Sequence, residues 1–377
     1  MSSPGSSAAD GVVHLIDDLL ARAITRRASD IHFDPNEDQF RVRCRLDGLL
    51  QDVDHLPGAL ADNVIAWLKV LAGLLTYRKD IPQEGAFKAD PSWMNGAAPI
   101  DIRVATFPTV RGERAVVRLM YSVGQVSGLD ELGLSAGMVA ELRRAAQQPQ
   151  GLILVTGPAG SGKSTTLYAL ARHILAVAPG RSVTSLEDPV EQRVGGMAQI
   201  QVQPHGELTY ARAMRSLLRQ DVEVLLVGEI RDAETAHIVT EAALTGHLIM
   251  STLHSGDPAE AVGRLLEMGI ATYQVVSALT VVVSQRLLRT VCPACGGQGR
   301  CTACMSTGYL GRTACGQIAV MDDALRQAVL DHRPIGELRD IIRRDRPDLA
   351  ADARHLVEEG KTTIDEVRRV LGTFGTE

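Results

Sequence analysis

The segment GPAGSGKST, residues 157–165, limits what this chain can fold into more than any other stretch. It fits the pattern G-x-x-x-x-G-K-[ST] and lies between the apolar run GLILVT and the helical pattern TTLYALARHIL. In such a strand–loop–helix unit, glycines let backbone N–H groups point at phosphate oxygens, and the helix N-terminus favours negative charge. Lys163 would reach the β- and γ-phosphates, and the Ser164 hydroxyl would ligate Mg²⁺. The segment therefore predicts a nucleotide site in an α/β domain.

The predicted phosphate loop supplies the residues that we expect to bind ATP, namely Gly157, Pro158, Ala159, Gly160, Ser161, Gly162, Lys163, Ser164 and Thr165. The alternative is a glycine-rich turn without a ligand, which the placement of the lysine, serine, strand and helix disfavours. A second GKT, at 360–362, has His355 where the pattern requires its first glycine, and no apolar strand precedes it. We interpret this second GKT as structural.

Three further apolar runs, SVTSLED, VEVLLVGE and HLIMSTLH, alternate with helical segments, which indicates a parallel sheet buried on both faces. Hydrolysis needs a carboxylate that orients the attacking water, and the ends of parallel strands deliver such groups. Glu229 ends one run, and Glu187 and Asp188 end another. The third run carries His247 and His254 at its opposite ends. These residues are catalytic candidates, with a structural role as the alternative for each.

Changes in pattern along the chain predict its domains. Residues 1–9 are small and polar, and we expect a disordered tail there. A helical repeat followed by strand-like segments predicts a small α+β domain at 10–121. The stretch SVGQVSG opens a linker that we expect to be flexible over 122–136. The α/β domain follows at 137–377, and its part from 316 to 377 is expected to form C-terminal helices.

Charge and hydropathy argue against two classes of protein. The formal net charge of -6 argues against a general nucleic-acid binder, which normally carries a basic excess. The sequence has no apolar run of the roughly 18–20 residues that a membrane-spanning helix needs. Its N-terminus also lacks the apolar core of a secretory signal. We therefore expect a cytoplasmic protein.

Four of the six cysteines fall within CPACGGQGRCTAC, residues 292–304. They form two C-x-x-C pairs, Cys292 with Cys295 and Cys301 with Cys304. In the cytoplasm thiols stay reduced, so such pairs indicate a metal site before they indicate disulfides. Four thiolates suit tetrahedral Zn²⁺ and leave no position open for substrate. A redox dithiol and free structural cysteines are the alternatives, and we expect the remaining two cysteines to be buried small apolar residues.

The motifs together resemble one family, the ATPases of type II secretion and type IV pilus assembly. The resemblance covers nearly the whole chain from about residue 16 and rests on RASDIHF, RVRCRLDG, PQEGAF, DIRVATFPTVRGERAVVRL, GPAGSGKST, LEDPVE, LLVGEIRDAETA, ALTGHLIMSTLHS, LLEMGI, SQRLLR, CPAC and TGYLGR. The cysteine pairs match the assembly and secretion branch, because the pilus-retraction branch normally lacks them. The resemblance implies a RecA-like P-loop ATPase domain, a smaller α+β N-terminal domain and a small zinc subdomain held by four cysteines.

Roles carry over by position within these motifs. In the family LEDPVE is the Asp box, LLVGE is the Walker B strand, and TGHLIMSTLH is the His box. The resemblance therefore implies that Glu229 is the catalytic carboxylate and that Glu187 assists at the metal and water. It also implies that Lys163 takes part in catalysis, and that His247 and His254 sense or position the γ-phosphate.

The resemblance further implies a hexamer with ATP between the two domains and arginines that reach the nucleotide across the ring. At matching positions these arginines are Arg103, Arg118, Arg215 and Arg219. The expected cofactors are ATP, Mg²⁺ and Zn²⁺. The expected partners are an inner-membrane platform protein and a membrane adaptor, with no nucleic acid, at the cytoplasmic face of the inner membrane.

The sequence departs from the family in three places. The usual LRQDPD has Val222 and Glu223 as its last two residues here, and the cysteine pairs are only five residues apart. The chain also starts almost at the family's second N-terminal domain, which puts recruitment through the first domain in doubt. Two other functions stay open: a nucleic-acid translocase and a scaffold that binds nucleotide without turnover.

Overall fold

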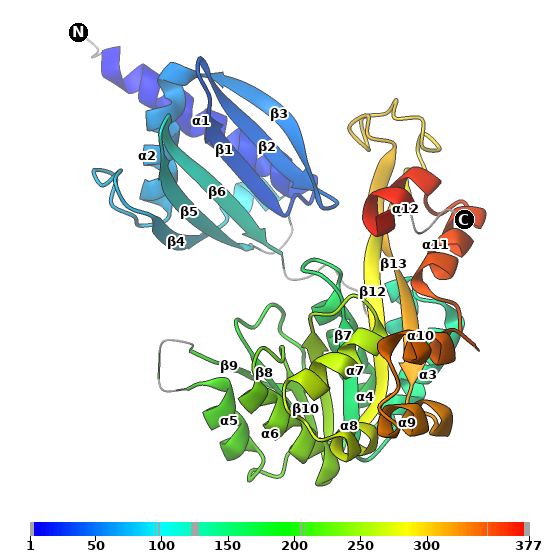
Figure 1. Ribbon diagram of the computed structural model, residues 1–377. Helices are drawn as coiled ribbons and strands as arrows, with labels where there is room; N and C mark the ends of the chain where they lie inside the picture. The colour runs from blue at the N-terminus through cyan, green and yellow to red at the C-terminus, as the bar shows by residue number, and fades with distance from the viewer. Residues whose placement is uncertain are drawn as a thin grey trace. The chain divides into compact units, whose positions relative to one another are not determined.

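The computed structural model describes most of the chain, which forms two compact units, Met1–Gly124 and Gln125–Glu377 (Figure 1). The described residues are 4–94, 96, 99–121, 128–203, 206, 208–344 and 346–372. Among these residues, no helix combines the length and the apolar character that crossing a bilayer requires.

The first unit is a six-stranded antiparallel sheet with order β3-β2-β1-β6-β5-β4. Its elements are α1 (Pro4–Thr25), β1 (Asp30–Pro35), β2 (Gln39–Leu46), β3 (Leu49–Pro57), a 3₁₀ turn (Gly58–Leu60), α2 (Ala61–Leu71), β4 (Gln83–Lys88), a 3₁₀ turn (Pro91–Met94), β5 (Asp101–Thr109) and β6 (Gly112–Met120). The strands alternate as the sequence predicts: in β5, Ile102 and Val104 are buried while Arg103 and Ala105 are exposed. Helices α1 and α2 supply the other half of a single core, which includes Ile16, Leu68 and Phe33.

The N-terminal tail differs from the prediction. Helix α1 begins at Pro4, so residues 4–9, expected to be disordered, are helical, and residues 1–3 lie outside the described part. Proline suits the first position of a helix, because its fixed φ is helical and its missing N–H has no partner there. The predicted start of the ordered chain, at residue 10, is therefore too late.

The structure also differs from the prediction of a flexible linker at 122–136. Residues 122–127 lie outside the described part. The next residues form a 3₁₀ helix, Leu129–Leu132, with Leu129 and Leu132 buried in the core of the second unit. Residues 129–132 are thus packed rather than flexible, because their leucines cover apolar surface.

The second unit is a seven-stranded sheet with order β13-β12-β7-β11-β10-β8-β9. Its strands are β7 (Gly151–Thr156), β8 (Val183–Glu187), β9 (Ala198–Gln201), β10 (Val224–Val227), β11 (Leu248–Leu253), β12 (Leu279–Val291) and β13 (Tyr309–Val320). All neighbouring strands are parallel except β12 and β13. The four apolar runs seen in the sequence are β7, β8, β10 and β11, which occupy the middle of the sheet.

Helices cover both faces of this sheet (Figure 1). They are α3 (Ala136–Ala146), α4 (Lys163–Val177), α5 (Tyr210–Leu217), α6 (Ala233–Leu244), α7 (Pro258–Glu267), α8 (Thr272–Ala278), α9 (Asp323–Leu330), α10 (Ile335–Arg344), α11 (Leu349–Glu358) and α12 (Ile364–Leu371). Alternate residues of β7 enter different cores: Leu152 and Leu154 pack with α5–α10, and Ile153 and Val155 pack with α3 and α4. The predicted α/β fold class, with a smaller α+β unit, is therefore confirmed.

Strands β12 and β13 form a long antiparallel hairpin that carries residues 292–308 at its tip. The sequence predicted helices from residue 316, but residues 316–320 complete β13 and the helices begin at Asp323. At the sheet edge, the backbone N–H of Gly316 donates to Oδ2 of Asp352 in α11 over 2.8 Å. Helices α11 and α12 lie beside the hairpin (Figure 1).

Candidate nucleotide site

The phosphate loop has the backbone that the sequence predicts. Strand β7 ends at Thr156 and α4 begins at Lys163. Gly157 and Gly162 have φ values of 144° and 88°, in the region that only glycine adopts readily. A Cβ at Gly157 would also lie 2.6 Å from the backbone oxygen of Gln285. Both glycines are therefore required for the loop to curl between strand and helix.

The loop contains polar groups suited to an anion. The Nζ of Lys163 donates to the backbone oxygens of Gly157 at 2.9 Å and Pro158 at 3.0 Å. Burial lowers the pKa of Lys163, and the nearby negative charge of Glu229 partly opposes this. The buried hydroxyls of Thr156 and Ser161 have no hydrogen-bond partner among the described residues. With the first-turn N–H groups of α4, these donors fit a bound phosphate.

Three strands place predicted site residues at the carboxyl-end edge of the sheet, where the phosphate loop also lies. Strands β8, β10, β11 and β7 run parallel, so their carboxyl ends lie together. Glu187 ends β8, Glu229 follows β10, and His254 follows β11. His254 Nε2 lies 3.7 Å from Glu229 Oε2, and their side chains are 57% and 20% exposed. The structure therefore brings these three residues and Lys163 to the same edge.

Glu229 has a partner that the sequence analysis missed. The guanidinium of Arg231 forms an ion pair with Glu229 and lies 4.0 Å from Oδ2 of Asp188. The hydrogen bond to Glu229 raises the pKa of Arg231 despite its partial burial. Arg231 follows Glu229 by two residues in VGEIRD, so proximity in sequence was the available signal. The ion pair places a positive charge directly beside the Glu229 carboxylate.

Glu187 is held in the interior, with only 4% of the residue exposed. Its carboxylate accepts hydrogen bonds from the hydroxyls of Tyr168 and Ser185 and from Nε2 of Gln199, the last at 3.2 Å. Burial and the contact with Glu187 raise the pKa of Tyr168, so this phenol remains a donor. Tyr168 OH also accepts from the backbone N–H of Glu191 at 3.3 Å. Glu187 is therefore fixed firmly at the end of β8.

His247 lies away from this edge. It precedes β11, and its backbone oxygen accepts from the N–H of Gly151, the first residue of β7. Its Nδ1 is 3.2 Å from the backbone oxygen of Ala242. The length of β7 separates it from the phosphate loop, about 20 Å at 3.3 Å per residue. The structure does not bring His247 to the phosphate loop of its own chain.

The four predicted arginines also lie outside the loop. In the first unit, Arg103 and Arg118 are cross-strand partners in β5 and β6, and Arg118 Nε donates to Asp30 Oδ1 over 2.9 Å. In the second unit, Arg215 and Arg219 line a pocket of about 550 Å³ between α5 and α6. Arg215 pairs there with Glu234 at 2.7 Å. The residues that line this pocket include none from the phosphate loop.

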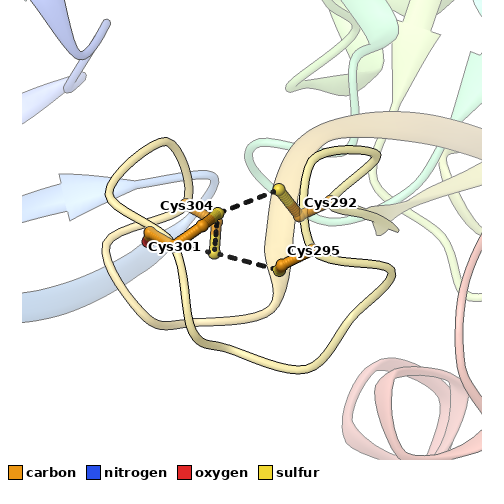
Figure 2. A group of neighbouring side chains, drawn as sticks. All are labelled: Cys292, Cys295, Cys301 and Cys304. Carbon is orange, nitrogen blue, oxygen red and sulfur yellow. Dashed lines mark hydrogen bonds between the residues drawn. The ribbon is translucent and has the colours of Figure 1, made fainter.

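The four clustered cysteines converge at the tip of the β12–β13 hairpin (Figure 2). Their Sγ atoms all lie within 4.8 Å of one another, with separations of 3.7 Å for Cys292–Cys301, 3.7 Å for Cys295–Cys304 and 3.4 Å for Cys301–Cys304. Four thiolates around one Zn²⁺, at Zn–S distances of about 2.3 Å, would lie about 3.8 Å apart. The cluster therefore fits a tetrahedral metal site.

The lone cysteines lie in separate apolar clusters, Cys44 in the core of the first unit and Cys315 with Leu288 and Leu356 near α11. Cys44 and Cys315 are free and buried, as the sequence analysis expected. Burial raises the pKa of Cys44 to about 11 and that of Cys315 to about 12. Both thiols stay neutral and pack as small apolar groups.

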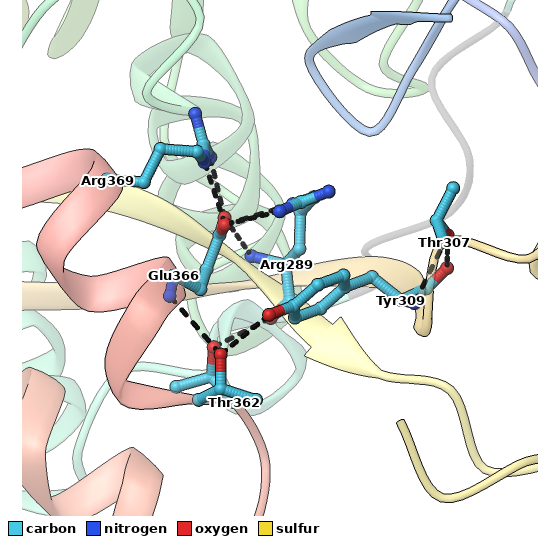
Figure 3. Close-up of polar contacts among 7 residues, drawn as sticks. Arg289, Thr307, Tyr309, Thr362, Glu366 and Arg369 are labelled. Atoms are coloured by element: carbon cyan, nitrogen blue, oxygen red, sulfur yellow. Dashed lines mark hydrogen bonds and ion pairs between the residues drawn. The ribbon is translucent and has the colours of Figure 1, made fainter. Parts of the chain in front are cut away.

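The base of the cysteine hairpin is attached to α12 by a charged clamp (Figure 3). The buried carboxylate of Glu366 accepts hydrogen bonds from the backbone N–H, Nε and Nη2 of Arg289 and from Nε and Nη2 of Arg369. The Arg289 guanidinium also stacks on Tyr309 at 4.0 Å, and Tyr309 OH bonds to Thr363. This clamp could not be predicted from the sequence, because Arg289 and Glu366 lie more than 70 residues apart.

Fold and site together define a P-loop α/β protein with a cysteine cluster on a hairpin of its main sheet. The family model described as "Type II/IV secretion system protein" matches residues 6–369. The chain therefore belongs to this family, and the resemblance drawn from its motifs is confirmed.

Named relatives come from both branches of the family. The chain is 37% identical to the type IV pilus assembly ATPase PilB of Thermus thermophilus, with 93% of this chain and 42% of PilB covered. It is 40% identical to the type II secretion system protein HxcR of Pseudomonas aeruginosa, with 95% and 77% covered. The chain thus spans less than half of PilB and about three quarters of HxcR.

Solved structures support the fold. The ATPase DotB of Legionella pneumophila superposes with a TM-score of 0.71 at 22% identity, with 94% of each chain covered. The pilus retraction motor PilT gives a TM-score of 0.62 at 22% identity, with 94% of this chain and 96% of that chain covered. At these identities the likeness concerns the architecture alone.

Proposed function

We propose that this chain is a Mg²⁺-dependent ATPase that powers type IV pilus assembly or type II secretion. The observation that carries the proposal is that the phosphate loop, Glu229 and His254 lie together at the carboxyl ends of the parallel strands. The names of PilB and HxcR support the two biological settings and do not decide between them.

Each residue at this edge has a chemical task in the proposed reaction. The phosphate loop binds the β- and γ-phosphates of ATP through its backbone N–H groups, and Lys163 binds them through its ammonium group. Glu229 accepts a hydrogen bond from the attacking water and orients it toward the γ-phosphate, with His254 beside it. Arg231 balances the charge of Glu229 and holds its carboxylate in place. Mg²⁺, which Ser164 would hold, supplies charge neutralisation on the phosphates when bound.

Glu187 acts at the metal and water in the proposal carried over from the family. Its three donors hold its carboxylate at one place at the end of β8. His247 has no part in this proposed site, since the length of β7 separates it from the loop.

The cysteine cluster is proposed to bind Zn²⁺. Four thiolate ligands complete a tetrahedron, so the metal has no open position for substrate. The zinc would then close the tip of the β12–β13 hairpin as a structural site. The nucleotide site contains all of its own groups without it.

Oligomerisation and partners complete the proposal. The motor is a hexamer, and Arg103, Arg118, Arg215 and Arg219 contribute positive charge to the nucleotide across the ring. Hydrolysis changes the arrangement of the domains and drives an inner-membrane platform protein, with a membrane adaptor as a further partner. The proposed location is the cytoplasmic face of the inner membrane.

Steady-state ATP hydrolysis by the Glu229→Gln variant tests the proposal. Loss of the carboxylate should reduce turnover by roughly 100-fold or more, while binding of a fluorescent ATP analogue stays within a factor of about three. Glu337→Gln, on the exposed surface of α10, is the matched control. Unchanged turnover in Glu229→Gln would remove Glu229 from the mechanism. ATP binding without turnover in the unmodified protein would favour a scaffold, and turnover stimulated by DNA would favour a translocase.

A further inference from the structure

Strand β12 extends past the end of the strand that carries the phosphate loop. Ser284 of β12 pairs with Thr156, the last residue of β7, and β12 continues to Val291. The next residue, Gln285, therefore lies beside the loop itself rather than beside β7. It is 1% exposed, so its amide group must find its partners inside the protein.

Both ends of the Gln285 amide bind the loop region. Its Nε2 donates to the backbone oxygen of Ser161 at 2.8 Å, and its Oε1 accepts from the hydroxyl of Thr166 at 2.9 Å. Ser161 precedes Lys163 and Thr166 follows it, so one side chain ties the loop to the first turn of α4. A Cβ at Gly162 would lie 3.1 Å from this same Nε2. The loop glycine and the glutamine therefore fit together.

The chemistry of the partners decides the orientation of the amide. A backbone carbonyl can only accept a hydrogen bond, so the NH₂ end of Gln285 must face Ser161. The carbonyl end is then left to accept from the Thr166 hydroxyl. Among the standard side chains of this length, a glutamine carries a neutral donor and a neutral acceptor side by side. An apolar side chain here would leave the buried Ser161 oxygen without this partner.

We propose that Gln285 is the positioning residue that holds the phosphate loop in its nucleotide-binding conformation. It acts through Ser161 and Thr166 and does not itself need to touch nucleotide. The inference rests on the proposed function, because it deepens the role of the same site. A residue that only stabilised the core would lower the unfolding temperature without changing affinity for ATP in folded protein.

The first test compares the full-length Gln285→Leu variant with Ser284→Ala. Ser284 is the adjacent buried residue, and its hydroxyl donates to the backbone oxygen of Gly256 rather than to a residue of the loop. Gln285→Leu should weaken binding of a fluorescent ATP analogue about tenfold and raise the KM for ATP similarly, because an unsatisfied buried carbonyl distorts the loop. Ser284→Ala should leave both within about twofold. Equal affinities in folded Gln285→Leu and the unmodified protein, or equal losses in the two variants, would overturn the proposal.

Gln285→Glu gives a second readout, which remains useful if Gln285→Leu folds poorly. The ionised carboxylate accepts from Thr166 but cannot donate to Ser161, whereas the protonated form can do both. Burial raises the pKa of such a carboxyl, so its ATP affinity relative to the unmodified protein should recover at least about threefold between pH 8 and pH 6. A pH-independent ratio would count against positioning. Because these tests measure binding, they stay informative even if the unmodified protein shows no turnover.

Discussion

The phosphate-loop edge and the base of the cysteine hairpin both contain carboxylates and basic groups, but they use them in opposite ways. At the loop edge, Glu229 and His254 are partly exposed, and the buried hydroxyl of Ser161 has no partner among the described residues. At the hairpin base, Glu366 accepts five hydrogen bonds from two arginines. The buried and fully satisfied Glu366 holds structure together, whereas the partly exposed Glu229 and His254 and the unsatisfied Ser161 hydroxyl are available to a ligand.

The comparison predicts that Glu366→Gln will cost more stability than any other change considered below. The substitution removes the charge that balances Arg289, whose side chain is only 12% exposed. Breaking a buried pair in this way costs about 3 kcal/mol of unfolding free energy. Urea denaturation should show this loss, while ATP affinity in folded protein should not change. Asp365→Asn, on the exposed side of the same helix, is the control, and an equal effect in both variants would end the distinction between the two regions.

The two GKT segments offer a matched pair for the nucleotide site. Lys163→Ala should weaken ATP binding about 100-fold, because it removes a charged donor from the phosphates. Lys361→Ala should have no such effect, since Lys361 is an exposed residue paired with Glu359 at 2.8 Å. Isothermal titration calorimetry with ATP measures the affinity of both variants. Comparable losses in the two variants would mean that the loop has not been assigned correctly.

Acid should weaken the clamp at the hairpin base by protonating Glu366. Burial alone would raise the pKa of Glu366, but hydrogen bonds from Arg369 and Arg289 outweigh it and lower the pKa from 4.5 to about 2. The stabilisation is therefore complete above pH 4.5 and is lost as the pH falls toward 2. Between pH 5 and pH 3 this amounts to about 2 kcal/mol at about 1.36 kcal/mol per pH unit. Urea denaturation at both values should show a smaller difference in Glu366→Gln; an identical difference would contradict the cause.

Cys292→Ser is expected to change zinc content and stability without a marked effect on nucleotide binding. Loss of one of the four ligands should abolish bound zinc, measured by atomic absorption, and should lower stability or assembly. ATP affinity in the folded, zinc-free variant should stay within about twofold, because the loop contains all of its own groups. Complete loss of nucleotide binding in that variant would show that the cysteine cluster belongs to the nucleotide site after all. Cys315→Ser, a buried cysteine outside the cluster, controls for the substitution itself.

The central sheet and its loop could be predicted because their signals are local. The apolar runs of β7, β8, β10 and β11 and the GKST sequence each lie within a few consecutive residues, as does the strand-end position of Glu229. Arg231 also lies close to Glu229 in the sequence, but an arginine just past a strand end is too common to mark a functional residue.

The missed parts depend on contacts between distant residues. Gln285 meets Ser161 across 124 positions, and Glu366 meets Arg289 across 77. The β12–β13 hairpin was not predicted, because buried polar residues such as Ser284 and Gln285 interrupt its apolar pattern. His247 shows the limit of transfer by motif: the His box was present, yet its first histidine lies at the far end of β11.

The hydrogen bond between Gly316 and Asp352 has a consequence for self-association. Strand β13 is the last strand on its side of the sheet, where unpaired N–H and C=O groups invite another chain to add a strand. The carboxylate of Asp352 occupies the place of a neighbouring strand's carbonyl, and α11 covers that part of the edge. A protein proposed to assemble into a closed ring must avoid open-ended stacking of its sheets. One buried aspartate on a helix blocks that route at this position.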